Sequence, residues 1–171
     1  MGTGKSTLGR HLAQHWHTRF IDTDHEIERM TKMRIPEIFA QKGEEEFRRL
    51  ERDWVDNHMP EGGCVVATGG GLVIPEGMAE LLKTKGVVMC LHASLETILK
   101  RTAGHRHRPL LNVEDPEARI RTLYAERDPI YRQAGTVILT DARPMADIIN
   151  HVLRAYRREA TDWAKAHGTK P

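Results

Sequence analysis

The chain has 171 residues, of which 39% are hydrophobic and 29% are charged, and its formal net charge is +2. This length suits one domain with a sizeable core, and the near balance of charge gives no reason to expect nucleic acid or a membrane surface as a partner. The apolar runs are far shorter than the ~20 residues of a membrane span, and the start lacks the apolar region of a signal peptide. We therefore expect a cytoplasmic protein, with Cys64 and Cys90 as small buried side chains on neighbouring strands.

Short apolar runs alternate along the chain with longer amphipathic stretches, which predicts an α/β domain with a mostly parallel sheet covered on both faces. The apolar runs predict strands over residues 19–22, 63–68, 86–92 and 136–140. The amphipathic stretches predict helices over residues 5–17, 25–33, 36–58, 75–85, 94–102, 115–133 and 144–166. Residues 103–114 are rich in cations without a helical period, which predicts a surface loop.

A Gly-rich segment, Gly2-Thr-Gly-Lys-Ser-Thr7, stands directly before the first predicted helix. It matches the end of the phosphate-binding pattern G-x-x-x-x-G-K-[ST]. In such a loop the backbone N–H groups and the helix N-terminus hold phosphates, the lysine reaches the outer phosphates, and the hydroxyl binds Mg²⁺. The segment therefore predicts nucleotide binding through Lys5 and Ser6.

The first glycine of this pattern and the apolar strand that should feed the loop do not precede Gly2. That strand is central in a doubly wound sheet, and four buried side chains contribute ~6–12 kcal/mol, against a typical net stability of ~5–15 kcal/mol. We expect the chain to begin one strand late, with a start placed at an internal methionine as the preferred explanation. A shortened, inactive relative is the alternative.

Charged residues and glycines follow the predicted strands. Asp22 and Asp24, at the end of the first strand, are i and i+2 neighbours that can face one cleft, or they can cap the next helix. Arg48 and Glu51 are i, i+3 neighbours on a predicted helix and can pair. Three glycines at 69–71 follow the second strand and permit close approach of the backbone to a ligand, although a tight turn would use them equally.

Taken in order, these segments resemble the shikimate kinase family from Gly2 to about Val152. The matching strings are G-T-G-K-S-T at 2–7, D-T-D at 22–24, G-E-x-x-F-R-x-x-E at 43–51, G-G-G at 69–71, R-P-L-L at 108–111 and R-D-P-I-Y at 127–131. Only the phosphate-loop string is specific by itself. The other strings are weak one by one, but their occurrence in the same order makes the set specific.

The resemblance implies a P-loop NTPase fold of the nucleoside monophosphate kinase type, with three α/β/α layers and the central first strand absent from this chain. It implies a single kinase domain over residues 1–171, with a substrate-binding helical region at about 24–58 and a lid at about 103–114. The implied reaction converts ATP and shikimate to ADP and shikimate 3-phosphate, on the route to aromatic amino acids. The implied working form is a monomer.

The resemblance also implies roles for individual residues. Those in catalysis would be Lys5, Asp24 and Arg108. Those around ATP would be Gly2, Thr3, Gly4, Lys5, Ser6, Thr7, Arg101, Arg108 and Arg143. Those around shikimate would be Asp24, Arg48, Gly69, Gly70, Gly71 and Arg127, with Glu51 orienting Arg48. Mg²⁺ would be held by Ser6 and by Asp22, through water.

Other functions are compatible with parts of the pattern. A small-molecule kinase resembling gluconate kinase is the nearest alternative, and a nucleoside monophosphate kinase is disfavoured because no further basic cluster could hold a second phosphate. A non-catalytic nucleotide-binding relative is also possible if the first strand is absent from the natural protein. Nucleic-acid binding by the basic stretch at 154–165 is disfavoured, because acidic residues interrupt it and its aromatic residues are few.

Overall fold

A computed structural model describes residues 2–103, 113–141 and 143–168 of the chain. Its helices are α1 (Lys5–His15), α2 (Thr23–Thr31), α3 (Ile35–Asp53), α4 (Met78–Lys85), α5 (Leu95–Thr102), α6 (Pro116–Ala134) and α7 (Met145–His167). Its strands are β1 (Arg19–Asp22), β2 (Cys64–Ala67), β3 (Met89–His92) and β4 (Thr136–Leu139). A π-helical turn, Trp54–His58, continues α3. The predicted α/β class and order of elements are confirmed.

The strands form two separate parallel pairs. β1 lies beside β2, with Ile21 opposite Val66, and β3 lies beside β4, with Leu91 opposite Ile138. Within the described residues β2 and β3 are not hydrogen-bonded to each other. The prediction for the cysteines was therefore wrong: Cys64 on β2 and Cys90 on β3 lie on strands that are not paired with each other, and both side chains are only half-buried.

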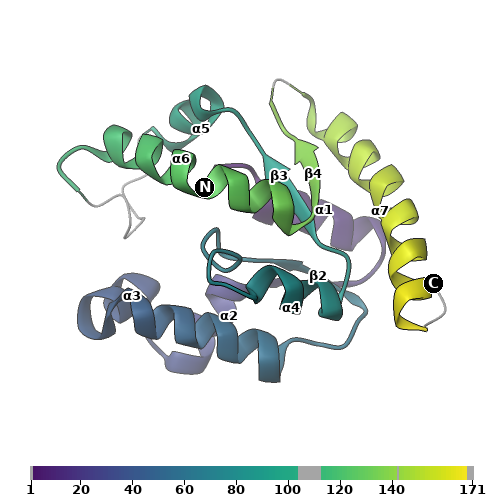
Figure 1. Ribbon diagram of the computed structural model, residues 1–171, viewed down its shortest axis with the longest axis horizontal. Helices are drawn as coiled ribbons and strands as arrows, with labels where there is room; N and C mark the ends of the chain where they lie inside the picture. The colour runs from purple at the N-terminus through teal and green to yellow at the C-terminus, as the bar shows by residue number, and fades with distance from the viewer. Residues whose placement is uncertain (1, 104–112, 142, 169–171) are drawn as a thin grey trace.

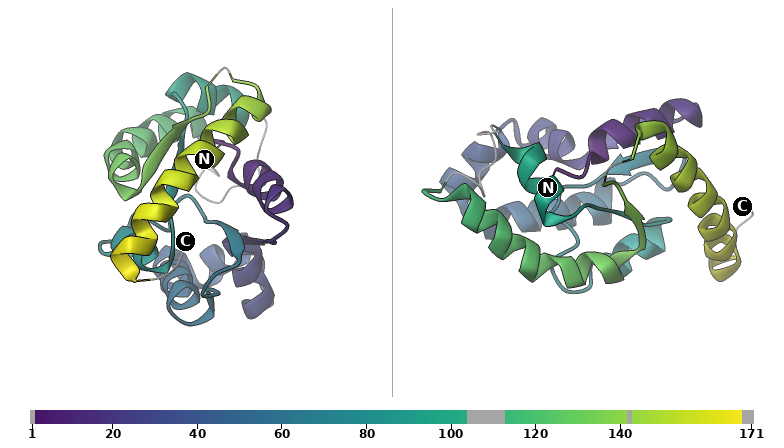
Figure 2. Two further views of the ribbon diagram at one scale, coloured as in Figure 1. Left: turned by 90° about the vertical axis from the view of Figure 1, so that its right-hand side faces the viewer. Right: turned by 90° about the horizontal axis from the view of Figure 1, so that it is seen from above.

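Helices cover both faces of the strands, as the apolar runs predicted. Seen from above, α1 and α7 lie on one side of the strands and α6 lies on the other (Figure 2). In Figure 1, α2, α3 and α4 lie in the half of the molecule that holds β2, whereas α5 and α6 lie beside the β3–β4 pair. The two largest clusters of buried side chains are an α1–α7 cluster (Leu8, Leu12, Ile138, Ile148, Val152, Ala155) and an α4 cluster (Trp54, Val55, Leu72, Val73, Met78, Leu82, Ala134). Smaller clusters lie between α5 and α6 and between α2 and α3.

Local signals explain where the helices begin and bend. Ser94 caps α5 by accepting a hydrogen bond from the N–H of Thr97, and Asp115 caps α6 in the same way from Ala118. The long helix predicted over residues 36–58 is interrupted at Gly43, whose φ of 83° lies in the left-handed region that glycine adopts without strain. The carboxyl ends of β1 and β2 lie at one edge, with Asp22 opposite Ala67, and the candidate site is built there.

Candidate active site

The phosphate loop enters α1 through a left-handed glycine. Gly4 has φ 87° and is the N-cap of α1, and its carbonyl accepts the N–H of Leu8 at 2.9 Å. The first N–H groups of α1 are therefore open to an anion. From α5, Arg101 donates to the carbonyl of Gly2 at 3.3 Å and to that of Thr140 at 2.8 Å. The predicted nucleotide residue Arg101 thus lies against the loop.

Ser6 and Asp22 meet directly at the mouth of this loop. The Ser6 hydroxyl donates to Oδ2 of Asp22 at 2.8 Å, and Oδ1 of Asp22 accepts the N–H of Asp24 at 3.2 Å. Asp22 therefore caps α2 and faces the phosphate loop with the same side chain. The expectation that Asp22 and Asp24 share a strand face was wrong, because β1 ends at Asp22 and Asp24 lies in the first turn of α2.

Two buried carboxylate oxygens without hydrogen-bond partners converge on Gly69. They are Oδ1 of Asp24 and Oε1 of Glu51. A Cβ atom added to Gly69 would lie 2.7 Å from the first oxygen and 2.8 Å from the second, so a side chain at this position would displace the two carboxylates. The Gly69 N–H donates to the hydroxyl of Thr23 at 2.9 Å, which fixes the loop at this distance. Burial, reinforced by Asp22, raises the pKa of Asp24, while the charge of Lys5 opposes the rise.

Arg48 is held on α3 by carboxylates on both sides, as the i, i+3 spacing predicted. Its guanidinium donates to Glu51 at 2.5 Å and to Glu44 at 2.6 Å. The side chain of Glu51 is only 2% exposed, and its burial raises its pKa to about 7 against the lowering effect of Arg48. A Cβ added to Gly71 would collide with the guanidinium of Arg48. The absence of side chains at Gly69 and Gly71 thus leaves room for Arg48, Asp24 and Glu51.

Tyr131 of α6 connects Gly70, the middle one of the three glycines, to the second predicted arginine, Arg127. Its hydroxyl donates to the carbonyl of Gly70 at 2.5 Å. Burial raises the pKa of Tyr131, while the nearby Arg127 and Arg48 lower it, which places both arginines beside this hydroxyl. Tyr131 was not predicted as a site residue, although it ends the string R-D-P-I-Y at 127–131.

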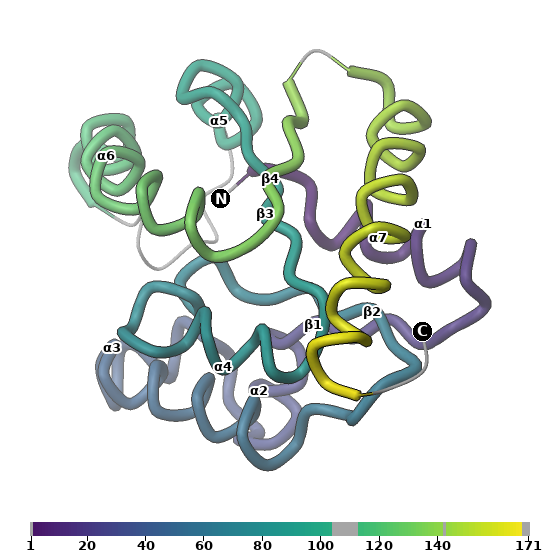
Figure 3. Tube along the Cα trace, turned by 45° about the vertical axis from the view of Figure 1, so that its right-hand side comes forward, coloured from purple at the N-terminus to yellow at the C-terminus, as the bar shows by residue number. Residues whose placement is uncertain are grey.

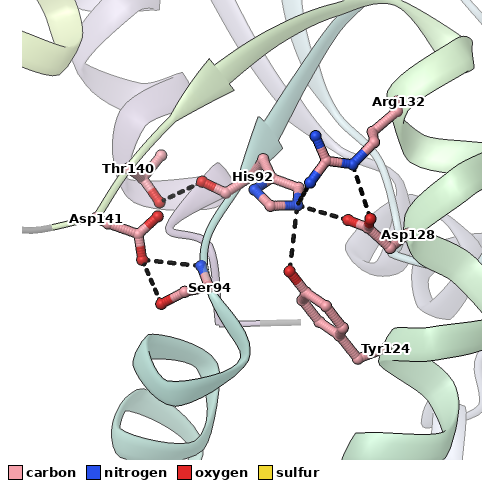
Figure 4. A network of polar contacts seen from close by, with 7 residues as sticks. All are labelled: His92, Ser94, Tyr124, Asp128, Arg132, Thr140 and Asp141. Atoms are coloured by element: carbon pink, nitrogen blue, oxygen red, sulfur yellow. Dashed lines mark hydrogen bonds and ion pairs between the residues drawn. The ribbon is translucent and has the colours of Figure 1, made fainter.

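A polar network at the end of β3 was not anticipated from the sequence (Figure 4). Nε2 of His92 contacts Oδ1 of Asp128 at 2.5 Å, and Arg132 donates to the other carboxylate oxygen at 2.7 Å. Although burial opposes it, the hydrogen bonds from Arg132 and His92 lower the pKa of Asp128. Because Asp128 directly follows Arg127, the network anchors the part of α6 that carries this arginine. The only signal in the sequence was a histidine ending an apolar strand.

Not every predicted site residue joins this arrangement. The predicted residues that do join it lie around the edge at the carboxyl ends of β1 and β2. They are Ser6, Asp22, Asp24, Arg48, the glycines at 69–71 and Arg127. Arg108 and most of the predicted lid lie outside the described residues. Arg143 is exposed in the segment between β4 and α7, where it lines a surface hollow with Asp147, Asn150 and Arg154.

The donor set at the phosphate loop suits a hard cation bound together with phosphates. Among residues 2–103, 113–141 and 143–168, no group of three or more His, Cys, Asp or Glu side chains could hold a metal ion by itself. Ser6 and Asp22 offer one hydroxyl and one carboxylate, and Mg²⁺ typically takes one or two such protein ligands while phosphates and waters complete its shell. In the described part of the chain, no helix combines the length and apolar character needed to cross a bilayer.

Comparison with protein families gives one consistent result. The family model described as shikimate kinase matches residues 1–157. A shikimate kinase of Aromatoleum aromaticum is 43% identical over 143 residues, which covers 84% of this chain and 82% of the relative. One from Thiobacillus denitrificans is 42% identical over 170 residues, covering 97% of this chain and 93% of the relative.

Solved structures agree with the family match. The shikimate kinase from Acinetobacter baumannii in complex with shikimate has a TM-score of 0.85 at 40% identity, covering 91% of this chain and 87% of the other. The shikimate kinase from Aquifex aeolicus has a TM-score of 0.75 at 30% identity, covering 91% and 90%. The P-loop kinase fold predicted from the sequence is therefore confirmed.

Proposed function

This chain belongs to the shikimate kinase family, and we propose that it transfers the γ-phosphoryl group of ATP to a hydroxyl of shikimate, giving shikimate 3-phosphate and ADP. The observation that carries this assignment is that a buried oxygen of Asp24, Oδ1, which has no hydrogen-bond partner within the described residues, and the guanidinium of Arg48 both lie against the loop of Gly69 and Gly71. A hydroxylated carboxylic acid offers what these groups lack, a hydroxyl to donate to Asp24 and a carboxylate to accept from Arg48.

The nucleotide lies, in this proposal, with its phosphates over the loop from Gly2 to Thr7. The N–H groups at the start of α1 and the charge of Lys5 hold the phosphate oxygens, with Thr3 and Gly4 shaping the loop. Ser6 and Asp22 would hold Mg²⁺, which would supply charge neutralisation on the phosphates. Arg101, already fixed at Gly2, and Arg143 would lie against the adenine end.

Asp24 receives the proton of the acceptor hydroxyl. The hydroxyl oxygen bonds to the γ-phosphorus, the bond from that phosphorus to the bridging oxygen of ADP breaks, and the hydroxyl proton passes to the Asp24 carboxylate. A base whose pKa is raised by burial accepts this proton more readily than an exposed aspartate. Lys5 lies near enough to act electrostatically on Asp24 and can also reach the transferring group.

The substrate carboxylate is held by Arg48 and Arg127, and Gly70 and Gly71 bring the backbone close to the ring. Tyr131 fixes the carbonyl of Gly70, and Glu51 fixes the direction of Arg48. Two guanidinium groups beside one hydroxyl-binding carboxylate suit a hydroxylated carboxylic acid, because a planar fork matches a carboxylate bidentately. Shikimate and gluconate both meet this requirement, and the match to shikimate kinases favours shikimate as the acceptor.

Several predictions belong to the same proposal. Arg108 would neutralise the transferring phosphoryl group when the lid at about 103–114 closes over the helical region at about 24–58. One kinase domain acting as a cytoplasmic monomer also stays a prediction. The alternatives are a gluconate-kinase-like enzyme and an impaired nucleotide-binding relative. Measurements of ADP formation with shikimate and with gluconate distinguish them from a shikimate kinase.

Replacement of Arg48 by lysine tests the acceptor assignment. Lysine keeps the charge but loses the fork, so Arg48→Lys should raise the KM for shikimate about tenfold or more and leave the KM for ATP unchanged. Arg49→Lys is the matched control, because Arg49 is exposed and pairs only with Glu46 among the contacts seen in the described residues. Equal effects of the two replacements, or an effect confined to ATP, would contradict the proposal.

A further inference from the structure

The helix α6 carries Arg127, a predicted acceptor residue, next to a break in its own hydrogen bonding. Pro129 lies inside this helix, two residues after Arg127. Proline has no N–H to donate to the carbonyl four residues earlier, so the carbonyl of Ala125 lacks its usual helical partner. The backbone of α6 therefore holds the turn around Arg127 less firmly than an unbroken helix would.

Two side-chain contacts hold this turn, one on each side of the proline. Before it, Oδ1 of Asp128 contacts Nε2 of His92 at 2.5 Å. After it, the hydroxyl of Tyr131 donates to the carbonyl of Gly70 at 2.5 Å. Asp128 and Arg127 lie three and four residues before Tyr131, so all three share one side of the helix. Arg127 is thus held between an anchor on β3 and an anchor on the glycine loop.

The contact with His92 is the more buried of the two that Asp128 makes in Figure 4. The side chain of His92 is 10% exposed, and its ring packs edge-on against Tyr124 with the centroids 6.1 Å apart. Arg132 donates to the other carboxylate oxygen at 2.7 Å, but its side chain is 54% exposed. A polar contact sheltered from water is stronger than an ion pair that water screens. His92 is therefore the partner that fixes Asp128.

The main chain of His92 makes a separate connection, to the nucleotide side of the site. Its carbonyl accepts the N–H of Thr140 at 2.8 Å and the hydroxyl of Thr140 at 3.1 Å. Arg101 donates to the same hydroxyl at 3.2 Å and to the carbonyl of Gly2 at 3.3 Å. A replacement of the His92 side chain therefore removes the contact with α6 and leaves the connection to the phosphate loop in place.

We propose that His92 is a positioning residue for the acceptor: its imidazole holds Asp128 and so fixes the turn of α6 from which Arg127 binds the acceptor's carboxylate. In Figure 3, α6 leads directly into β4 with β3 alongside, and α6 contacts β3. The role in acceptor binding rests on the proposed function, whereas the anchoring of α6 does not. Because His92 acts through Asp128 and not on a reacting atom, its loss should weaken acceptor binding but leave phosphoryl transfer intact in the filled site.

His92→Phe and His92→Gln test this role as a pair. Phenylalanine keeps a ring against Tyr124 but has no nitrogen for Asp128, whereas the amide nitrogen of glutamine reaches about the position of Nε2. His92→Phe should raise the KM for shikimate about tenfold, with kcat and the KM for ATP changed less than about twofold. His92→Gln should keep all three values within about twofold of the wild type.

His58→Phe is the matched control, because His58 also contacts a carboxylate but is exposed on the π-helical turn after α3. It should change none of the kinetic values. Arg132→Gln removes the exposed partner of Asp128 and should raise the KM for shikimate less than His92→Phe does. Equal rises in the KM for ATP and for shikimate, a fall in kcat alone, or a loss with glutamine as large as with phenylalanine would overturn the proposal.

Hydrogen exchange measures the anchoring without substrate or activity. In His92→Phe the amides of residues 125–131 should exchange about tenfold faster than in the wild type, with those of α7 unchanged, while His92→Gln should behave as the wild type does. If His92→Phe does not fold, Asp128→Asn weakens the same contact and should give the same two results.

The exchange data also separate this proposal from the proposed function. Unchanged exchange over residues 125–131 in His92→Phe would overturn the positioning role, whatever the kinetics. A wild type that forms no ADP with shikimate would contradict the proposed function instead, and exchange over α6 would still decide whether His92 anchors this helix.

Discussion

The buried carboxyl group of Glu51 is expected to make the stability of this protein fall as pH rises through neutrality. Its side chain is 2% exposed, and burial raises its pKa from 4.5 to about 7 despite the ion pair with Arg48. Between those values the folded state binds more protons than the unfolded state, so the free energy of unfolding decreases as pH increases. The Glu51→Gln variant, which cannot titrate, should lack this contribution.

The size of the effect follows from the pKa difference. The rise of the Glu51 pKa from 4.5 to about 7 corresponds to at most about 3–4 kcal/mol across the full window, at ~1.4 kcal/mol for each pH unit. The free energy of unfolding of the wild type minus that of Glu51→Gln should therefore be larger at pH 5 than at pH 8, by up to that amount. Denaturant titrations at the two pH values, followed by tryptophan fluorescence, measure the difference directly.

Glu44→Gln is the matched control for this prediction. Glu44 binds the same guanidinium at 2.6 Å, but its side chain is 47% exposed. Glu44→Gln therefore removes a carboxylate from Arg48 without removing a buried carboxyl group. The relative stability of Glu44→Gln should change little between pH 5 and pH 8. An equal difference between wild type and Glu51→Gln at both pH values, or one that grows with pH, would refute the reasoning.

Three further predictions concern the site. Asp24→Asn should lower turnover about 10²–10⁴-fold because it removes the base, which steady-state kinetics measure. It should not lower the thermal midpoint, because it also removes a buried charge, which calorimetry measures. Gly71→Ala should lower the free energy of unfolding by about 1–3 kcal/mol and raise the KM for shikimate, because the new Cβ displaces Arg48. Gly62→Ala is its control: no atom lies within 4 Å of the new Cβ, so neither stability nor KM should change. Arg101→Ala should raise the KM for ATP but leave that for shikimate unchanged, and an equal rise in both would argue against its position at the loop.

The sequence predicted the elements well because their signals are local. The Gly-rich start, the apolar runs and the amphipathic stretches each act within a few residues, and the helices and strands follow them in order. Arg48 and Glu51 were also predictable, since an i, i+3 spacing fixes their contact once the helix forms. Asp22 and Asp24 reached one edge for a different reason, because α2 begins directly after Asp22.

Other features depend on contacts between distant segments, which no local pattern encodes. The contact of His92 with Asp128 joins β3 to α6, and that of Tyr131 with Gly70 joins α6 to the loop after β2. The burial of Glu51, and hence its pKa, depends on how α3 packs near Asp24.

The central claim is tested most directly by measuring ADP formation from Mg-ATP with and without shikimate, using this chain shown to be folded by circular dichroism. The account predicts ADP release that requires shikimate, with one shikimate 3-phosphate formed for each ADP, and no comparable release with gluconate. A folded chain that binds ATP but releases no shikimate-dependent ADP, or one that phosphorylates gluconate instead, would contradict it.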